Sequence, residues 1–556
     1  MASKTNGSSG ARFHPGVINS LAVMNSRPAN SLRRRVAELL VVRASGHLSD
    51  QQRRYPQWEL PNSELQRLLR DGVGGVILLG GSAVELQQRT KQLQGWSEQR
   101  LLVCADVEEG VGQRFEGASW LVPPLALGRI HQREPELALD LSERYGRCTG
   151  EQARRCGLNW VLGPVCDINN NPANPVINVR AWGEDAKTAS ALAVAFQRGL
   201  KQAGALGCAK HFPGHGDTSS DSHLDLPVLP HSRERLEQIE LPPFQAAITA
   251  GVESVMTAHL VLPELDPQQP ATLSKAVLTD LLRRQMRFNG LVVTDALVME
   301  AISARHGAAE AAVLAFEAGA DLILMPAEAD AAIDGLCDGF SSGRLCLERL
   351  DESLQRRAHA LASIPTSTAK GPIVSAEEQA LEAELVRHSI TVGEAKVLPQ
   401  AGINLVRVDA MVPSAAALSG WSPALRTPEA QGFRSIVLHG EGLSPWSGQA
   451  DAPLAMDRLG DGAVLLQLFL RGNPFRAGRD AQEPWAAAIQ QLIALNRLAG
   501  VVVYGSPYLW DSLKPLLPSS CPAAYSAGQM QEAQRQVLTK LFPSATPTGN
   551  SGAFTD

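Results

Sequence analysis

Short apolar runs alternate with longer amphipathic stretches over the first 360 residues, and this pattern constrains the fold more than any other feature. Eight runs of β-branched and other apolar residues predict strands at 39–43, 75–79, 101–105, 160–164, 206–210, 254–259, 290–294 and 321–325. The stretches between them that predict helices include 63–70, 136–156, 187–202, 233–250, 275–284 and 309–318. Eight strand–helix alternations predict an α/β fold of the (β/α)₈ TIM-barrel type. A doubly wound sheet is the alternative, but no glycine-rich dinucleotide fingerprint follows the first strand.

A second, smaller unit is predicted after the barrel. Residues 364–372 are rich in Pro, Ser, Thr and Gly, which is typical of a linker. A predicted helix at 377–387 is followed by predicted strands at 404–408, 435–439, 463–470, 500–504 and 523–525, with helices at 485–498 and 529–541. This order predicts a C-terminal α/β sandwich. The predicted organisation is an N-terminal extension (1–30), the barrel (31–363), a linker (364–375), the sandwich (376–542) and a disordered tail (543–556).

The charge balance and the ends of the chain exclude several classes of partner. Lys and Arg total 51 against 57 Asp and Glu, so there is no electrostatic case for binding nucleic acid or an anionic membrane. No apolar run is long enough to span a membrane. The polar, Gly/Ser-rich start lacks the apolar core of a signal peptide, and the 8 cysteines form no CxxC pair. We therefore expect a cytoplasmic protein with free thiols.

Ionisable residues follow five consecutive predicted strands of the barrel. In strand order they are Asp106, Asp167, the pair Lys210 and His211, His259, and Asp295. Active sites of such barrels lie at the carboxyl ends of the strands, where these side chains meet. Buried charges at that rim need partners, so a purely structural barrel would not gather them there.

Residues 210–223 hold the densest polar cluster, and three interpretations of it stay open. A zinc site would use His211, His215, Asp221 and His223, but an intervening Pro-Gly breaks the helix that would align the first two. The residues could also form a polar loop whose members satisfy one another. The favoured interpretation is an acid/base histidine, His223, whose neighbour Asp221 holds its tautomer and favours its protonated form.

Asp295 ends the predicted seventh strand. An aspartate there commonly caps the next helix, which is the structural alternative. Its place at the rim, opposite the histidine loop of a barrel, favours a catalytic role.

These segments resemble glycoside hydrolase family 3, in particular its β-N-acetylglucosaminidase branch and the β-N-acetylhexosaminidases of bacterial cell-wall recycling. Residues 210–223 match the signature Lys-His-Phe-Pro-Gly-His-Gly-x4-Asp-Ser-His with all its spacings. The segment that ends at Asp295 resembles the nucleophile strand of the family. Residues 106–110 and 179–185 resemble the family's Asp-x-Glu-Gly-Gly and arginine-containing loops. The resemblance covers about residues 35–360, the whole predicted barrel.

The resemblance implies a role for each matching residue. Asp295 would be the nucleophile, His223 the general acid and then the general base, and Asp221 its partner. The first sugar would be held by Asp106, Arg114, Arg180, Lys210 and His211, whose charged groups suit ring hydroxyls. No cofactor and no metal is implied. The only partner expected is a small carbohydrate substrate.

The implied activity is that of a retaining exo-β-N-acetylhexosaminidase acting on terminal β-linked N-acetylglucosamine of muropeptides or chitooligosaccharides. A covalent glycosyl-aspartate would form and then be hydrolysed. The alternatives are a β-glucosidase or glycosyl phosphorylase on the same scaffold, a non-catalytic sugar-binding relative, and a metallohydrolase.

One departure from the family pattern stands at the third strand. Where relatives have Gly-Gly-Arg, this chain has Glu109, Gly110 and Val111, which predicts an altered rim of the sugar site or an altered loop stability. The C-terminal unit need not be catalytic, because residues 210–223 supply the acid. Its expected role is packing against the barrel, with closure of the site or partner binding as the alternative.

Overall fold

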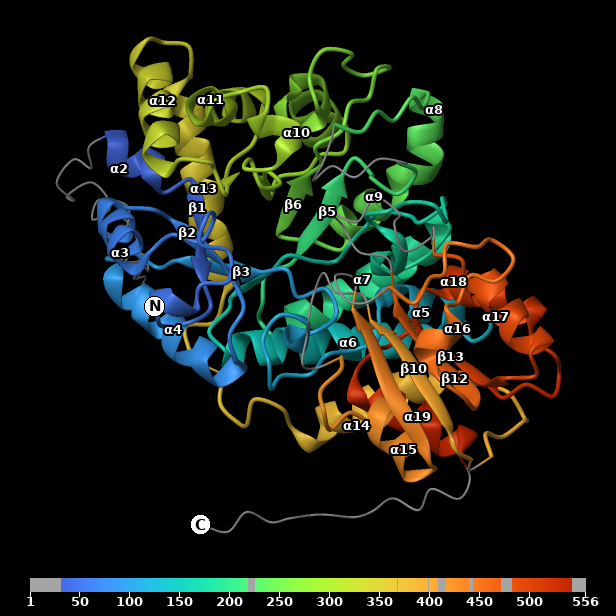
Figure 1. Ribbon diagram of the computed structural model, residues 1–556. Coiled ribbons are helices and arrows are strands. Elements are labelled where there is room, and N and C mark those ends of the chain that lie inside the picture. The colour runs from blue at the N-terminus through green and yellow to red at the C-terminus, as the bar shows by residue number, and fades with distance from the viewer. Residues whose placement is uncertain are drawn as a thin grey trace, which may run out of the picture.

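The computed structural model describes residues 32–218, 226–367, 369–398, 400–408, 417–439, 444–471 and 483–542. They form a barrel and a second α/β domain that packs beside it (Figure 1). The predicted extension (1–30) and the predicted tail (543–556) lie outside the described residues.

The eight strands of the barrel lie where the sequence predicts them. They are β1 (Leu40–Ser45), β2 (Gly75–Leu79), β3 (Leu102–Ala105), β4 (Trp160–Val161), β5 (Cys208–Phe212), β6 (Ser254–Thr257), β7 (Leu291–Val293) and β8 (Ile323–Leu324). Parallel pairing gives the orders β4-β3-β2-β1-β8 and β5-β6-β7. Parallel bridges from Trp160 to Leu206 and from Val293 to Leu322 join the two groups into a ring. The predicted (β/α)₈ barrel is thus confirmed.

An outer layer of helices surrounds the strands. Its helices are α2 (Leu32–Ala37), α3 (Asn62–Asp71), α4 (Ala83–Trp96), α5 (Pro124–His131), α6 (Pro135–Arg155), α7 (Ala186–Gln202), α8 (Arg233–Arg235), α9 (Pro242–Thr249), α10 (Glu300–Ser303), α11 (Ala308–Ala318), α12 (Ala329–Ser341) and α13 (Leu347–Ser363). The segments Leu236–Glu240 and Ala276–Gln285 are wound as π-helix. Gly319 ends α11 with φ of 129°, a left-handed conformation that favours glycine.

The interior of the barrel is apolar below its mouth. Side chains from alternate strand positions, among them Val41, Cys104 and Trp160, pack there with Leu361 at the end of α13. Helix α13 therefore closes the barrel at the end opposite the predicted site.

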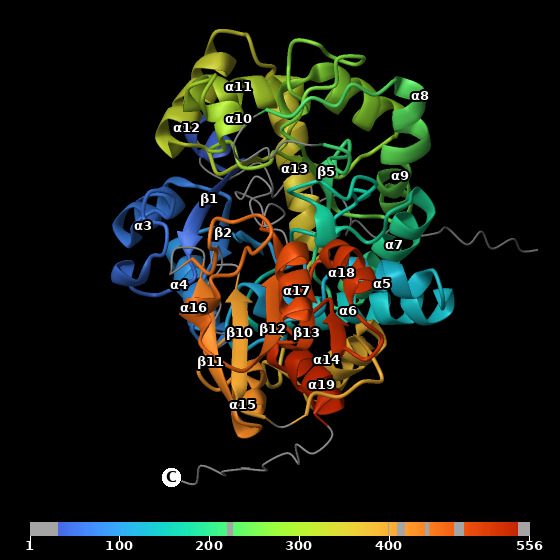
Figure 2. The same cartoon turned by 45° about the vertical axis from the view of Figure 1, so that its right-hand side comes forward.

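The C-terminal domain is a six-stranded sheet between two helical layers (Figure 2). Its order is β11-β10-β12-β13-β14-β9, and only β9 is antiparallel. The strands are β9 (Thr391–Val392), β10 (Gly402–Val408), β11 (Phe433–His439), β12 (Ala463–Leu470), β13 (Leu498–Gly505) and β14 (Ala523–Ser526). The helices are α14 (Ala376–Ser389), α15 (Pro423–Ala430), α16 (Met456–Leu459), α17 (Trp485–Ala494), α18 (Pro507–Leu513) and α19 (Gln531–Leu541).

Alternating residues of this sheet pack against different helices. Leu466 packs in the same cluster as Ile489 of α17, and its neighbour Leu465 packs in another with Leu538 of α19. The predicted sandwich is therefore confirmed. The helix predicted at 485–498 is too long, because α17 ends at Ala494 and Asn496 takes a left-handed φ of 52° before β13 begins.

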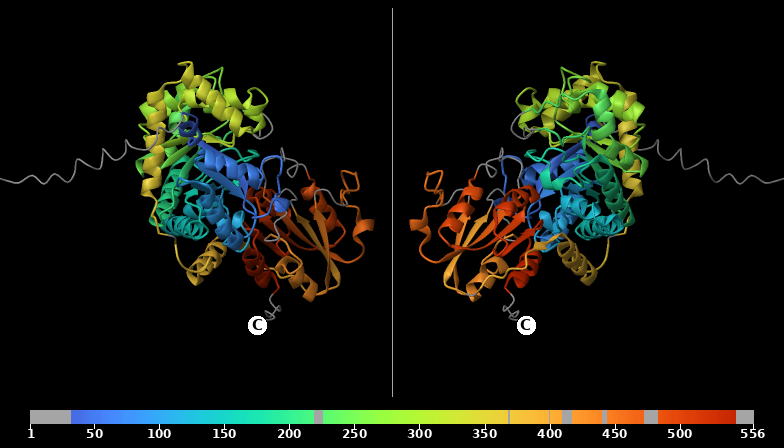
Figure 3. Two further views of the ribbon diagram at one scale, coloured as in Figure 1. Left: turned by 90° about the vertical axis from the view of Figure 1, so that its left-hand side faces the viewer. Right: turned by 90° about the vertical axis from the view of Figure 1, so that its right-hand side faces the viewer.

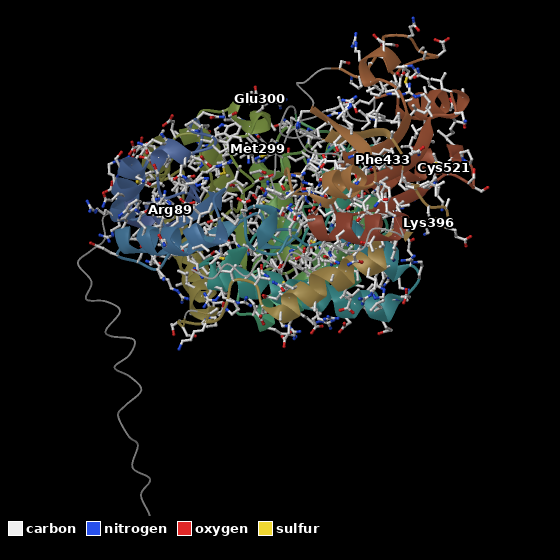
Figure 4. The ribbon with its side chains drawn as sticks, turned by 60° about the horizontal axis from the view of Figure 1, so that its bottom comes forward. Arg89, Met299, Glu300, Lys396, Phe433 and Cys521 are labelled. Atoms are coloured by element: carbon white, nitrogen blue, oxygen red, sulfur yellow. The ribbon has the colours of Figure 1, made fainter. Side chains whose placement is uncertain are left out.

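The two domains lie side by side (Figure 3). Figure 4 labels Phe433 and Cys521 on the C-terminal domain, well apart from Arg89 on barrel helix α4. Helix α14 of the C-terminal domain contacts the barrel through two ion pairs. Glu384 pairs with Arg144 at 2.6 Å, and Glu378 pairs with Arg155 at 2.7 Å. Within the described ranges, no helix has both the length and the apolar character needed to cross a bilayer.

A buried carboxylate just before β8 links the strands to the outer helices. Asp321 is fully buried and pairs with Arg283, with Arg349 at 2.9 Å and with Arg356 at 3.0 Å. Burial raises the pKa of Asp321, but the three guanidinium groups outweigh burial and hold its pKa below the ordinary 3.8. Ionised Asp321 therefore stabilises the fold at pH values above 3.8. This stabilisation is lost as the pH falls through the lowered pKa.

We accordingly expect Asp321→Asn to lower Tm most at neutral pH. The Tm difference from wild type should narrow as the pH is lowered from 7 to below 3.8, because the carboxylate is protonated first in the unfolded state and then, as the pH falls through the lowered pKa, in the folded state. Thermal unfolding followed by circular dichroism across that range measures the difference. A Tm difference that stays constant with pH would contradict this account of Asp321.

Candidate active site

Four charged side chains form a continuous network at the carboxyl ends of β3 and β5. Lys210 Nζ lies 2.7 Å from Asp106 Oδ1 and 2.7 Å from Glu108 Oε1. The two oxygens of Glu108 accept from Nε and Nη2 of Arg180 at 2.8 Å each. Lys210 and Glu108 are buried, whereas the Asp106 side chain is 38% exposed. Asp106 is thus the member of the network that is open to a ligand.

The charges in this network stabilise one another. Burial raises the pKa of Glu108, but attraction to Arg180 and Lys210 outweighs burial and holds that pKa well below 4.5. Burial lowers the pKa of Lys210, but Asp106 and Glu108 outweigh burial and raise it above 10.5. Glu108, Lys210 and Arg180 are therefore ionised at neutral pH, and the network offers both donors and acceptors to hydroxyl groups.

His211 is held by a buried aspartate. Asp167 Oδ2 lies 2.7 Å from His211 Nδ1 and also accepts from the His211 backbone N–H at 3.1 Å. Burial raises the pKa of Asp167, but His211 and the backbone N–H of His215, which donates to Oδ1 at 2.6 Å, outweigh burial and bring it below 3.8. Because ionised Asp167 only accepts, His211 carries its proton on Nδ1 when neutral. Its Nε2 lies 3.5 Å from Arg180 Nη2, so the histidine joins the charged network.

His215 lies in the segment that follows β5. It is 2% exposed, and its Nδ1 lies 2.7 Å from Thr218 Oγ1. Burial lowers its pKa to about 4, and Asp167 and Asp295 offset only part of that shift. His215 is therefore neutral at neutral pH and lies within electrostatic reach of Asp295.

Asp295 follows β7 at the same rim. Its backbone N–H donates to Thr257 Oγ1 at 3.2 Å, and its Oδ1 accepts from the N–H of Ala296 at 2.7 Å. His259 Nε2 donates to the carbonyl oxygen of Ala296 at 3.1 Å, and its Nδ1 lies 2.8 Å from Thr272 Oγ1. Residues at the ends of β6 and β7 thus fix the backbone around Asp295.

Two arginines complete the rim. Arg114, whose predicted sugar contact rests on the family resemblance, donates from Nε to the carbonyl oxygen of Asp106 at 3.1 Å. Arg43 is not among the predicted site residues. It lies two residues after Val41, which faces the barrel interior, and its guanidinium carbon lies 5.4 Å from the centre of the Tyr55 ring. Arg43 ends the predicted first strand. Grouping the ionisable residues at strand ends, as for the other strands, would therefore have included it.

The side chain of Glu109 pairs with residues outside the charged network. It is fully buried, and its Oε2 accepts from Trp120 Nε1 at 2.9 Å and from Nη1 of Arg471 at 3.0 Å. The carboxylate of Glu109 thus faces Arg471 of the C-terminal domain, and the expected effect of this departure on the rim or on the stability of the loop stays a prediction.

The structure brings five predicted residues together: Asp106, Arg114, Arg180, Lys210 and His211. Asp221 and His223 lie outside the described residues. Among those that are described, no cluster of three His, Cys, Asp or Glu side chains is arranged to hold a metal ion. Sequence reasoning did not assign site roles to Glu108 and Asp167, the two buried carboxylates that hold Arg180, Lys210 and His211.

Comparison with protein families identifies both domains. Residues 31–360 match the Glycosyl hydrolase family 3 N terminal domain. Residues 397–543 match the Bacterial Glycosyl hydrolase family 3 C-terminal domain.

Individual proteins show the same relationship. Beta-hexosaminidase A of Pseudoalteromonas piscicida is 32% identical over 60% of this chain, which spans 61% of that relative's length. A beta-hexosaminidase of Neisseria meningitidis serogroup C is 35% identical over 51% of this chain and 79% of the relative. The solved structure of a glycoside hydrolase family 3 beta-N-acetylglucosaminidase from Paenibacillus sp. str. FPU-7 is 28% identical, with a TM-score of 0.73 over 92% of this chain and 97% of that one. With the first family match alone covering more than half of its length, this chain belongs to glycosyl hydrolase family 3.

Proposed function

We propose that this protein is a retaining exo-β-N-acetylhexosaminidase that removes terminal β-linked N-acetylglucosamine from small carbohydrates such as muropeptides or chitooligosaccharides. The observation that carries the proposal is the charged network of Asp106, Glu108, Arg180 and Lys210 at the rim that also holds Asp295. Relatives named beta-hexosaminidase and beta-N-acetylglucosaminidase support the choice of sugar.

The network suits the recognition of a sugar ring. Lys210 and Arg180 present N–H donors, and the exposed carboxylate of Asp106 accepts from hydroxyl groups. Hydrogen bonds to charged groups are stronger than those between neutral groups. Since Glu108 and Asp167 hold the cations and His211 in place, little reorganisation accompanies binding.

Asp295 attacks the anomeric carbon in the proposed first step. A bond forms between its carboxylate oxygen and that carbon, while the bond to the leaving-group oxygen breaks and His223 gives this oxygen a proton. In the second step His223 takes a proton from water, the water oxygen attacks the anomeric carbon, and Asp295 is released. Two displacements at one carbon retain its configuration.

Hydrolysis of two aryl glycosides tests the proposed substrate. We expect kcat/KM for p-nitrophenyl β-N-acetylglucosaminide to exceed that for the β-glucoside by about 100-fold or more, the range that loss of a specific polar contact can reach. In phosphate buffer the product should be free N-acetylglucosamine. Preference for the glucoside would refute the hexosaminidase assignment, and release of a sugar 1-phosphate would make the protein a phosphorylase.

Replacing His223 by alanine tests the proposed acid. We expect kcat/KM to fall at least about tenfold more for an N-acetylglucosaminyl disaccharide than for the p-nitrophenyl glycoside, because nitrophenolate needs little protonation to leave. His231→Ala is the matched control, since that histidine pairs with Asp217 at 2.9 Å and has no proposed role in the reaction. Equal losses on both substrates in His223→Ala would count against His223 as the acid.

A further inference from the structure

One arginine of the C-terminal domain reaches the loop that follows β3. Arg471 comes directly after β12, and its side chain is 13% exposed. Its Nη1 donates to Glu109 Oε2 at 3.0 Å, and its Nη2 donates to Glu109 Oε1. A guanidinium that meets both oxygens of a carboxylate fixes their relative position as well as neutralising the charge.

The loop that receives Arg471 also carries contacts of the sugar pocket. Glu109 is fully buried, and its carbonyl oxygen accepts from the N–H of Leu121 at 2.8 Å. The preceding residue, Glu108, faces the pocket and holds Arg180 and Lys210. Adjacent carboxylates thus join the C-terminal domain on one side of the backbone to the charged network on the other.

A tyrosine of the C-terminal domain contacts the neighbouring loop. Tyr508 of α18 donates its hydroxyl hydrogen to Glu184 Oε1 at 2.8 Å and accepts from Asn169 Nδ2 at 2.7 Å. Both partners lie in the segment between β4 and α7, which also carries Arg180. The C-terminal domain therefore contacts both segments that supply the charged network from β3 and β4.

We propose that Arg471 is a positioning residue for sugar binding, acting through Glu109 on the loop at 106–114. This inference rests on the proposed function and gives the C-terminal domain a role beyond packing. Without Arg471, the buried carboxylate of Glu109 loses its only cationic partner among the described side chains, and an uncompensated charge is unfavourable there. The loop then shifts toward water and carries Asp106 and Arg114 with it.

The test is a set of variants assayed on the N-acetylglucosaminide. We expect Arg471→Met to lower kcat/KM about tenfold, chiefly by raising KM, since a displaced binding loop weakens ground state and transition state alike. Arg471→Lys keeps the charge but loses the two-point contact, so its kcat/KM should lie between those of wild type and Arg471→Met. The double variant Glu109→Gln with Arg471→Met removes both charges and should recover to within about threefold.

A matched control breaks a different contact between the domains. Asp511→Asn removes the pair of Asp511 with Arg129 at 2.9 Å, in which the aspartate side chain is 52% exposed. An exposed pair of this kind contributes little, so we expect unchanged KM and kcat. The control separates loss of the buried pair from a general loosening of the domain contact.

Two results would overturn the role of Arg471: wild-type kinetics for Arg471→Met, or a double variant at least as impaired as Arg471→Met. Calorimetric titration with N-acetylglucosamine should rank the variants in the same order without depending on turnover. An inactive wild type would therefore refute the proposed function, while the titration would still decide the role of Arg471.

Discussion

Replacing Asp295 by alanine is expected to lower kcat on the N-acetylglucosaminide by about 10⁴-fold or more, as losses of principal catalytic groups commonly do. The alanine has no oxygen to attack the anomeric carbon, so the first displacement cannot occur. The backbone around residue 295 is held by Thr257 and His259 through hydrogen bonds to main-chain atoms, and the substitution leaves these in place. Steady-state assays and thermal unfolding of the same preparation measure activity and folding together.

Azide provides a specific control for this substitution. A small anion can enter the space left by the carboxylate, and we expect it to restore turnover of the aryl glycoside and to give a glycosyl azide of inverted configuration. A variant that retains activity within about tenfold of wild type would contradict the assignment of Asp295 as nucleophile.

Replacing Glu108 by glutamine is expected to lower the free energy of unfolding by about 3–5 kcal/mol, the usual cost of removing one partner of a buried ion pair. The change leaves Arg180 and Lys210 close together with one carboxylate fewer between them. Repulsion between these two cations displaces the donors of the proposed sugar site, so kcat/KM should fall as well. Urea unfolding at pH 7 measures the change in stability.

Glu310→Gln is the matched control for that substitution. Glu310 pairs with Arg344 at 2.9 Å, but the two side chains are 48% and 38% exposed. Exposed pairs contribute about 0–1 kcal/mol, so the control should unfold nearly as wild type does. If Glu108→Gln cost no more than this control, the buried network would not be what maintains the pocket.

The alternation of strands and helices was sufficient to predict the barrel and its mouth. In a parallel barrel the carboxyl ends of all strands meet at one rim, so residues such as Asp106, Lys210 and Asp295 could be grouped from the places where the apolar runs end. The ends of the elements were harder to predict. Leu498 continues the apolar pattern of α17 but belongs to β13, because the left-handed turn at Asn496 separates them.

The direction of side chains in loops could not be predicted in this way. Glu108 and Glu109 are adjacent and chemically alike, yet one pairs with Arg180 and Lys210 and the other with Arg471. That arginine is 362 residues further along the chain, and no local pattern connects the two. The contact depends on how the domains pack, which is a tertiary property.

Trapping of the glycosyl-enzyme tests the central claim most directly. A 5-fluoro derivative of an N-acetylglucosaminyl fluoride slows both steps but hydrolysis more, so a covalent intermediate accumulates. We predict that mass spectrometry finds one sugar added to the protein, located by peptide mapping on Asp295, and no addition to Asp295→Ala. Turnover that inverts the anomeric configuration and leaves the wild-type protein unlabelled, or labelling of another residue, would contradict the account.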